Sequence, residues 1–171
     1  LKGAQHFYGV KPDMSTFGKA MANGFSVSAI CGKKKIMELG SITNLKEERV
    51  FLLSTTHGAE MNGLSAFTET VKFLKKKNVI KHNWNYGAKL IKEKNKISKK
   101  LGVNDYVYFS GIACSPYFTC LDQNKKNSLE FRTLFIQEML KFNILMPWVS
   151  ISYRHNNKTL KKTLVALEKS L

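Results

Sequence analysis

The chain contains little that would support a disulfide framework, a metal centre or a membrane span. Its three cysteines, Cys31, Cys114 and Cys120, are an odd number and lack the spacing of a zinc site, so we expect buried free thiols. The four histidines are scattered, and no Ser/His/Asp pattern is present. No apolar run approaches the ~20 residues of a membrane-spanning helix. We therefore predict no bound metal and no membrane segment.

Arginine is also scarce, although the chain is strongly basic. A net charge of +16 would normally indicate nucleic-acid binding. However, only Arg49, Arg132 and Arg154 are arginines, and arginine is the residue that recognises phosphates and guanines with paired hydrogen bonds. The lysines lie on the polar faces of predicted helices. We therefore predict no nucleic-acid partner and keep a basic nucleic-acid-binding module as a weak alternative.

The chain opens without Met and without a charged-then-apolar leader, so we expect no signal peptide. It has 171 residues, of which 43% are hydrophobic, an ordinary share for a globular protein. These features predict a soluble, cytoplasmic protein.

Hydrophobic periodicity in the first half of the chain predicts an α/β arrangement. Short buried strands are expected over 26–31 and 50–54, with a helix over 34–39 between them. A longer helix follows, because apolar residues recur there at spacings of three and four. Its apolar stripe consists of Met61, Leu64, Phe67, Val71 and Leu74.

The second half predicts an α+β unit with three antiparallel strands. A helix over 84–100, ended by Gly102, precedes the first two strands. The strands are expected over 106–110, 117–121 and 148–152, and a helix is expected over 129–142. Leu134, Phe135, Met139 and Phe142 should face the core, and Leu160, Leu164, Leu167 and Leu171 should form the stripe of a last helix. We place the domain boundary so that residues 1–77 form one domain and residues 78–171, with the linking helix, form the other.

One lysine stands apart from the others. Lys19 lies in a window with no other charge between Asp13 and Lys33. A lysine that does covalent chemistry must be neutral for part of the time, and burial among apolar groups favours that form. The apolar neighbours expected to surround it are Phe17, Ala20, Met21 and Ala22. Spacing alone leaves a second interpretation, an ordinary surface lysine on a short helix over 18–23.

Two stretches around this lysine resemble a known family segment. Tyr8-Gly-Val-Lys-Pro-Asp13 and Ser15-Thr-Phe-Gly-Lys-Ala-Met-Ala-Asn-Gly24 resemble the cofactor-lysine segment of class III, fold type I pyridoxal-phosphate aminotransferases. They most resemble the glutamate-1-semialdehyde 2,1-aminomutase branch. The resemblance implies that Lys19 is the catalytic, cofactor-binding lysine that forms a Schiff base with pyridoxal 5'-phosphate.

A later segment resembles the family's phosphate-binding block. In Phe51-Leu-Leu-Ser-Thr-Thr-His-Gly58, the resemblance implies that Thr56, or less closely Thr55, binds the cofactor phosphate from the neighbouring subunit of a homodimer. His57 stands where the family has an aromatic residue. Phe135-Ile-Gln-Glu-Met-Leu140 and Ser152-Tyr-Arg-His155 also fit, so the resemblance covers nearly the whole chain.

The family also carries motifs that this chain lacks. An Asp-Glu-Val motif, whose Asp pairs with the pyridine nitrogen, and a Gly-Ser/Thr phosphate loop lie upstream of the matching stretch. We therefore expect the C-terminal portion of a longer enzyme of α/β class, in which a partial large domain is followed by a small α+β domain. The fragment alone is expected to be inactive.

The activity implied by the resemblance is transfer of an amino group on an amino-acid or amino-aldehyde substrate. In the aminomutase branch this gives 5-aminolevulinate, with Lys19 moving the proton. Two alternatives stay open: an ordinary class III transaminase acting on another keto or aldehyde substrate, and an inactive truncated fragment. His155 matches a family histidine, and we expect a capping or packed side chain there rather than a catalytic one.

Overall fold

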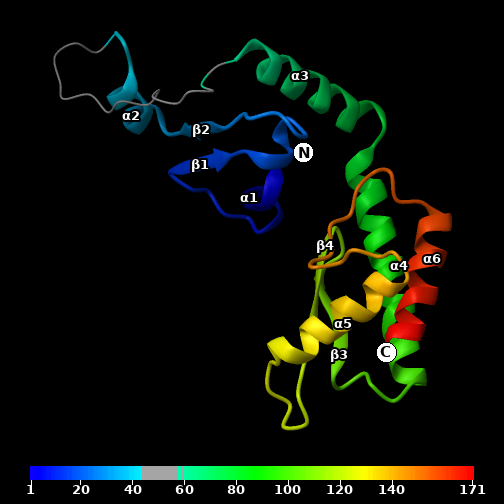
Figure 1. Ribbon diagram of the computed structural model, residues 1–171. Coiled ribbons are helices and arrows are strands. Elements are labelled where there is room, and N and C mark those ends of the chain that lie inside the picture. The colour runs from blue at the N-terminus through cyan, green and yellow to red at the C-terminus, as the bar shows by residue number, and fades with distance from the viewer. Residues whose placement is uncertain (44–57, 59) are drawn as a thin grey trace. The chain divides into compact units, whose positions relative to one another are not determined.

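The computed structural model describes residues 1–43, 58 and 60–171. They form two compact units, Leu1–Lys77 and Asn78–Leu171. Figure 1 shows the first unit from blue to teal and the second from green to red. Among the described helices, none combines the length and the apolar character that a bilayer crossing requires.

The first unit is built around a short two-stranded ribbon. Its elements are α1 (Gly3–Phe7), β1 (Met14–Phe17), a 3₁₀ helix (Lys19–Met21), β2 (Ala29–Gly32), α2 (Lys34–Met37), a second 3₁₀ helix (Glu38–Gly40) and α3 (Met61–Lys76). β1 pairs antiparallel with β2, from Met14 opposite Gly32 to Phe17 opposite Ala29. Helices at the two predicted positions, α2 and α3, are confirmed.

The strands of this unit differ from the prediction. β2 begins at Ala29 rather than at residue 26, because the ladder ends where Phe17 pairs with Ala29. β1 was not predicted, since its four residues show no alternation of apolar and polar side chains that a single sequence can reveal. The strand predicted over 50–54 lies outside the described residues.

The described part of the first unit buries very little of its apolar surface. Ala22 and Gly63 are its buried residues, whereas large side chains such as Phe7, Phe25 and Met61 are exposed. Cys31 is exposed too, so the prediction of a buried thiol there is wrong, because no described element covers its side of β2. Apolar surface of this extent usually contacts other protein.

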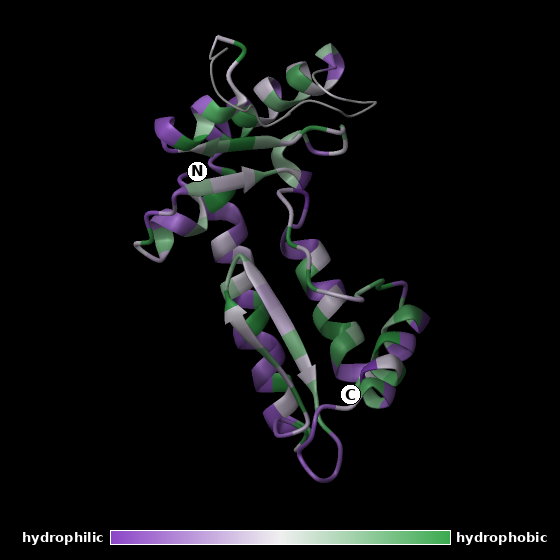
Figure 2. Ribbon diagram, turned by 90° about the vertical axis from the view of Figure 1, so that its left-hand side faces the viewer, coloured by the Kyte–Doolittle hydropathy of each residue, from purple (hydrophilic) through white to green (hydrophobic). Residues whose placement is uncertain are grey.

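The second unit is a hairpin packed against three helices. Its elements are α4 (Val79–Lys100), β3 (Val107–Ile112), β4 (Ser115–Cys120), α5 (Leu129–Lys141) and α6 (Asn157–Ser170). β3 and β4 pair antiparallel, with Phe109 opposite Phe118. Figure 2 shows hydrophilic and hydrophobic residues recurring along the helices, as amphipathic helices require.

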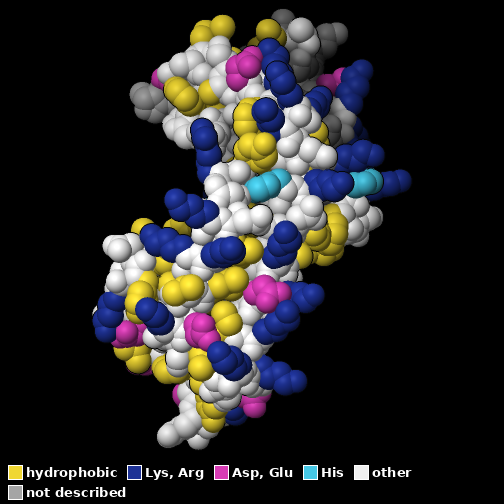
Figure 3. All heavy atoms as spheres, turned by 90° about the vertical axis from the view of Figure 1, so that its right-hand side faces the viewer, with side chains coloured by type: hydrophobic (Ala, Val, Ile, Leu, Met, Phe, Trp, Pro, Cys, Tyr) yellow, Lys and Arg dark blue, Asp and Glu magenta, His cyan; other side chains and the backbone are white. Residues whose placement is uncertain are grey.

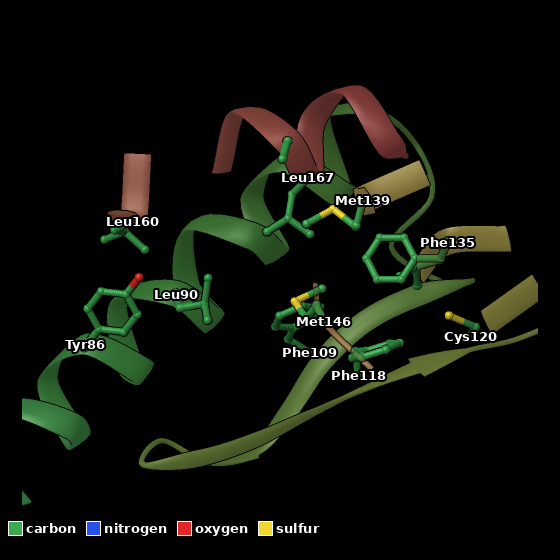
Figure 4. Packing of buried hydrophobic residues seen from close by; sticks show 12 residues of the cluster. Tyr86, Leu90, Phe109, Phe118, Cys120, Phe135, Met139, Met146, Leu160 and Leu167 are labelled. Carbon is green, nitrogen blue, oxygen red and sulfur yellow. The ribbon is translucent and has the colours of Figure 1, made fainter. Parts of the chain in front are cut away.

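The core of this unit gathers side chains from all five elements (Figure 4). The ring of Phe118 stacks on Phe109 with centroids 5.8 Å apart and meets Phe135 edge-on at 5.2 Å. Phe135 and Met139 are buried as predicted, whereas Leu134 is 48% exposed, so its assignment to the core is wrong. The physical reason is that α5 has apolar residues around most of its circumference, and periodicity alone does not select the buried face.

Two further predictions for the second unit are wrong. α4 begins at Val79 rather than Trp84, because the break after α3 is a single left-handed residue, Asn78, and Val79 is already buried. No strand forms over 148–152, a described segment in which Trp148 is 69% exposed. Just before this segment, Arg132, whose guanidinium also lies 4.2 Å over the Phe118 ring, donates a hydrogen bond to the Pro147 carbonyl.

Two cysteines and two glycines of this unit have distinct structural positions. Cys120 is buried as predicted, and Cys114 is half-buried. Gly102 follows the last turn of α4 with φ +72°, the left-handed conformation that a C-terminal glycine supplies. Gly87 lets the hairpin turn lie directly on α4, since a Cβ there would lie within 1.6 Å of the Ala113 carbonyl oxygen.

Three side chains of α4 fasten this helix to β3. Lys94 Nζ and Ser98 Oγ both donate hydrogen bonds to the Val107 carbonyl, the second at 3.1 Å. Asn95 donates to the Phe109 carbonyl at 2.9 Å and accepts from the Phe109 N–H at 3.1 Å. Backbone groups at the free edge of β3 are thereby satisfied without a third strand.

Lys94 is fully buried, and burial lowers its pKa to about 7. The neighbouring Cys120 side chain raises the pKa and offsets the effect of burial only in part. The Phe109 ring centroid lies 4.9 Å from the Lys94 nitrogen. The unfolded chain binds the proton with an ordinary lysine pKa, near 10.5. The contribution of Lys94 to stability is therefore largest above that pH and is lost as the pH falls from there through the folded-state pKa near 7.

Replacing Lys94 by methionine tests this dependence. Methionine keeps the aliphatic packing, and the Val107 carbonyl keeps its bond from Ser98. We expect the free energy of unfolding of Lys94→Met, relative to the parent, to rise by a few kcal/mol as the pH is lowered from 10 to 7. Urea unfolding followed by the fluorescence of Trp84 and Trp148 measures it. Lys96→Met, at an exposed lysine paired with Glu93, is the control and should show no such change.

Candidate cofactor-lysine site

Lys19 begins a strained turn directly after β1. We call residues 18–24 the Lys19 turn. Lys19 has φ +51°, Asn23 has φ +50° and Gly24 has φ +115°. For residues with a Cβ this left-handed conformation is uncommon and costs on the order of 1 kcal/mol each. Such outliers concentrate at ligand-binding and catalytic positions.

The helix that follows Gly18 is shorter than the one the surface-lysine interpretation predicts over 18–23, and Lys19 on it is exposed as that interpretation expects. Residues 19–21 form a single 3₁₀ turn, closed by a hydrogen bond of 3.1 Å from Met21 N–H to the Gly18 carbonyl. A second bond, 3.4 Å long, joins Phe25 N–H to the Ala22 carbonyl. The strained backbone thus presents the lysine side chain at the start of the turn.

The predicted apolar enclosure of Lys19 is wrong for the described part of the chain. Lys19 and Ala20 are exposed, Phe17 is 43% exposed and Met21 is half-buried, so that Ala22, at 1%, is the one enclosed neighbour. The reason is that described residues cover only the Ala22 side of the turn. The amine is therefore open to a small aldehyde.

The charges nearest in sequence pair with each other rather than with Lys19. Asp13 and Lys33 form an ion pair at the far end of the ribbon, and Lys33 N–H also donates to the Asp13 carbonyl at 3.0 Å. Within the part of the chain that the structure describes, no carboxylate forms an ion pair with Lys19.

The predicted phosphate contacts, Thr56 and Thr55, lie outside the described residues, as does His57. Over the described ranges, no group of three or more His, Cys, Asp or Glu side chains is placed to hold a metal ion.

His155 is a packed side chain, which agrees with the expectation from the sequence. Its Nδ1 accepts a hydrogen bond of 3.1 Å from Ser152 N–H, and its carbonyl lies 2.8 Å from His82 Nε2. Its ring stacks on Tyr86, with centroids 5.3 Å apart. The adjoining Asn156 caps α6, accepting from the N–H groups of Lys158 and Thr159. His155 therefore holds the loop before α6 against α4.

On the face drawn in Figure 3, lysine and arginine side chains are dispersed among other side chains rather than gathered in one stripe. Several pair with a carboxylate three residues earlier, as Lys72 does with Glu69 and Lys141 with Glu138. Exposed pairs of this kind contribute little to stability but reduce the local positive potential. They support the prediction that nucleic acid is not a partner, which stays a prediction.

The family model for aminotransferase class-III matches residues 3–136, which include the Lys19 turn, α3 and the β3–β4 hairpin. The chain belongs to the class III aminotransferase family. Pyridoxal phosphate is the cofactor of this family, and the resemblance seen around Lys19 is confirmed at the level of the family.

Similar proteins include both aminotransferases and aminomutases. The chain is 33% identical, over all of its length, to 3-aminobutyryl-CoA aminotransferase of Cloacimonas acidaminovorans (strain Evry), of which it covers 40%. It is 31% identical, over 98% of its length, to glutamate-1-semialdehyde 2,1-aminomutase of Fusobacterium nucleatum subsp. nucleatum, again covering 40%. The class III chain thus spans about 40% of the length of these relatives.

Solved structures show the same fold. The Sphingopyxis sp. MTA144 FumI protein, in its PLP internal aldimine form, superposes with a TM-score of 0.80 at 20% identity. The match covers 98% of this chain and 38% of that one. A transaminase with PLP bound gives the same TM-score at 17% identity, covering 98% and 40%. The predicted fold, part of a fold type I pyridoxal-phosphate transferase, is confirmed.

Acid sensitivity of the second unit tests the role of His155. Burial, and then the neighbouring His82, lower the His155 pKa below its usual value of 6.5. The unfolded chain therefore takes up the proton first, and stability is lost as the pH falls below about 6.5. Protonation also removes the Nδ1 acceptor used by Ser152 N–H.

We expect His155→Asn, whose amide oxygen keeps an acceptor near that position, to lose less stability than the parent between pH 6.5 and 5. Urea unfolding at each pH measures the difference. His6→Asn, at an exposed histidine of the first unit, should behave as the parent does. Equal acid sensitivity in His155→Asn and the parent would contradict the assignment.

Proposed function

We propose that Lys19 is the lysine that bonds covalently to pyridoxal phosphate in an enzyme that transfers amino groups. The observation that carries the proposal is the left-handed, exposed Lys19 at the start of a strained turn, inside the region that matches the family. The residues present fit this cofactor, since an exposed amine that pairs with no carboxylate among the described residues suits an aldehyde.

In this proposal Lys19 has two tasks. Its Nζ would hold the cofactor through the aldehyde carbon until a substrate amine took its place. As a free amine at the same place, Lys19 would act as the base that moves a proton between the substrate carbon and C4′ of the cofactor. Bound pyridoxal phosphate supplies the conjugated ring that withdraws electrons from that carbon.

Two substrates follow from the two kinds of relative. The first is glutamate 1-semialdehyde, whose amino group would move to the adjacent carbon to give 5-aminolevulinate. The alternative is ordinary transamination, and the relative that is a 3-aminobutyryl-CoA aminotransferase favours an amine carried on a coenzyme A thioester. Supplying each compound to the intact protein and following product by mass spectrometry distinguishes them.

A homodimer is part of the same proposal. Exposed apolar side chains of the first unit, including Phe7, Phe25 and Met61, support a face that contacts other protein. Thr56 of one subunit would then bind the cofactor phosphate of the other, with Thr55 as the alternative. A cytoplasmic location and an amino-acid or amino-aldehyde substrate belong to this proposal and rest on the resemblance.

Borohydride reduction in the presence of pyridoxal phosphate tests the role of Lys19. We expect the reduced label on the peptide that contains Lys19, and we expect Lys19→Ala to lose it. Peptide mapping by mass spectrometry is the measurement. Lys11→Ala, at another exposed lysine of the same unit, is the control and should keep the label. Label on a different lysine would reassign the cofactor site.

Substitution of Thr56 tests the proposed phosphate contact. Loss of one charge-assisted hydrogen bond, on the order of 1.5 to 3 kcal/mol, should weaken cofactor binding in Thr56→Val by roughly tenfold to a hundredfold. Equilibrium titration with pyridoxal phosphate measures the affinity. Thr55→Val is the matched control, and a larger effect there would move the assignment to Thr55.

A further inference from the structure

A glycine of α3 lies against the segment that follows the Lys19 turn. Gly63 is buried, and a Cβ added to it would lie 2.5 Å from Val27 Cγ2 and 3.2 Å from the Ser26 carbonyl oxygen. Side-chain carbons essentially never approach other atoms within 3.0 Å. The backbone of α3 therefore approaches this segment at a distance that only glycine permits.

Few hydrogen bonds within the Lys19 turn stabilise its conformation. Its left-handed residues are Lys19, Asn23 and Gly24, and two backbone hydrogen bonds, of 3.1 and 3.4 Å, close it. Strained backbone persists only where the surrounding structure holds it in place. α3 contacts residues 19–21 directly, so this helix is the external support that the structure shows.

We propose that Gly63 is a positioning residue for Lys19. Close approach at Gly63 lets the start of α3 hold Ser26 and Val27, and through them the C-terminal end of the Lys19 turn. A methyl group at position 63 pushes this segment away from the helix and moves the Lys19 amine from its place. The catalytic meaning of that movement rests on the proposed role of Lys19.

Helix propensity distinguishes a displacement of Lys19 from a general loss of stability of α3. Alanine is a better helix former than glycine, so Gly63→Ala, in the first turn of α3, should not by itself disfavour the helix. An unfavourable effect at Lys19 must therefore come from the contact with Ser26 and Val27. Removing Cγ2 from Val27 makes room for the new methyl group and should reverse the effect.

The experiment compares Gly63→Ala, the double variant Gly63→Ala with Val27→Ala, and Ser65→Ala, an exposed position on the same helix, as control. One measurement is the rate at which borohydride traps pyridoxal phosphate on Lys19. The other needs no cofactor: mass spectrometry follows the modification of Lys19 by acetic anhydride as a function of pH, relative to Lys11.

We expect Gly63→Ala to slow the trapping on Lys19 about tenfold or more and to change its acetylation profile, because a displacement well below 1 Å already matters for a reacting group. The double variant should return both measurements close to those of the parent, and Ser65→Ala should leave both unchanged. Should Gly63→Ala fail to fold, a folded double variant supports the contact and an unfolded one overturns it.

Parent-like trapping and acetylation in Gly63→Ala would overturn the proposal, as would a double variant as impaired as the single one. If the parent takes up no pyridoxal phosphate at Lys19, while acetylation still responds to Gly63→Ala and is restored by Val27→Ala, the positioning role stands and the proposed function fails.

Discussion

The second unit depends on the hydrogen bonds that three α4 side chains make to the outer edge of β3. A two-stranded hairpin is marginally stable by itself, and its free edge exposes backbone groups that need partners. Lys94, Asn95 and Ser98 satisfy those groups at Val107 and Phe109. Because Val107 and Phe109 also point their side chains into the core, these hydrogen bonds fix the position of the hairpin and the hydrophobic packing together.

One of these three side chains, Lys94, is buried at a cost in free energy. A fully buried lysine is held there in an environment that favours its neutral form, although its hydrogen bond anchors the helix. Gly87 lies seven residues earlier on α4, where close contact with Ala113 sets the other end of the hairpin. The hairpin is thus held against one helix by a polar contact at one end and by backbone proximity at the other.

The first unit differs from the second in two respects: its left-handed backbone residues are concentrated in the Lys19 turn, and it buries few side chains. Its described residues place three left-handed residues within the Lys19 turn, and they leave most large apolar side chains exposed. Exposed apolar surface of this extent is typical of a face that contacts other protein.

The sequence by itself determined the family, the isolated lysine, and the positions of most helices, because motifs and hydrophobic periodicity are local properties. It also identified Phe135 and Met139 as core residues, since both lie on the face of α5 that the hairpin covers. It failed for Leu134, for the strand at 148–152 and for the enclosure of Lys19, each of which depends on what lies opposite in space. Only the tertiary structure decided that Lys94 is buried and that Gly63 touches Val27, because these features arise where separate segments of the chain meet. It also showed that Lys19 is left-handed, a backbone angle that the residue type does not reveal because lysine rarely adopts it.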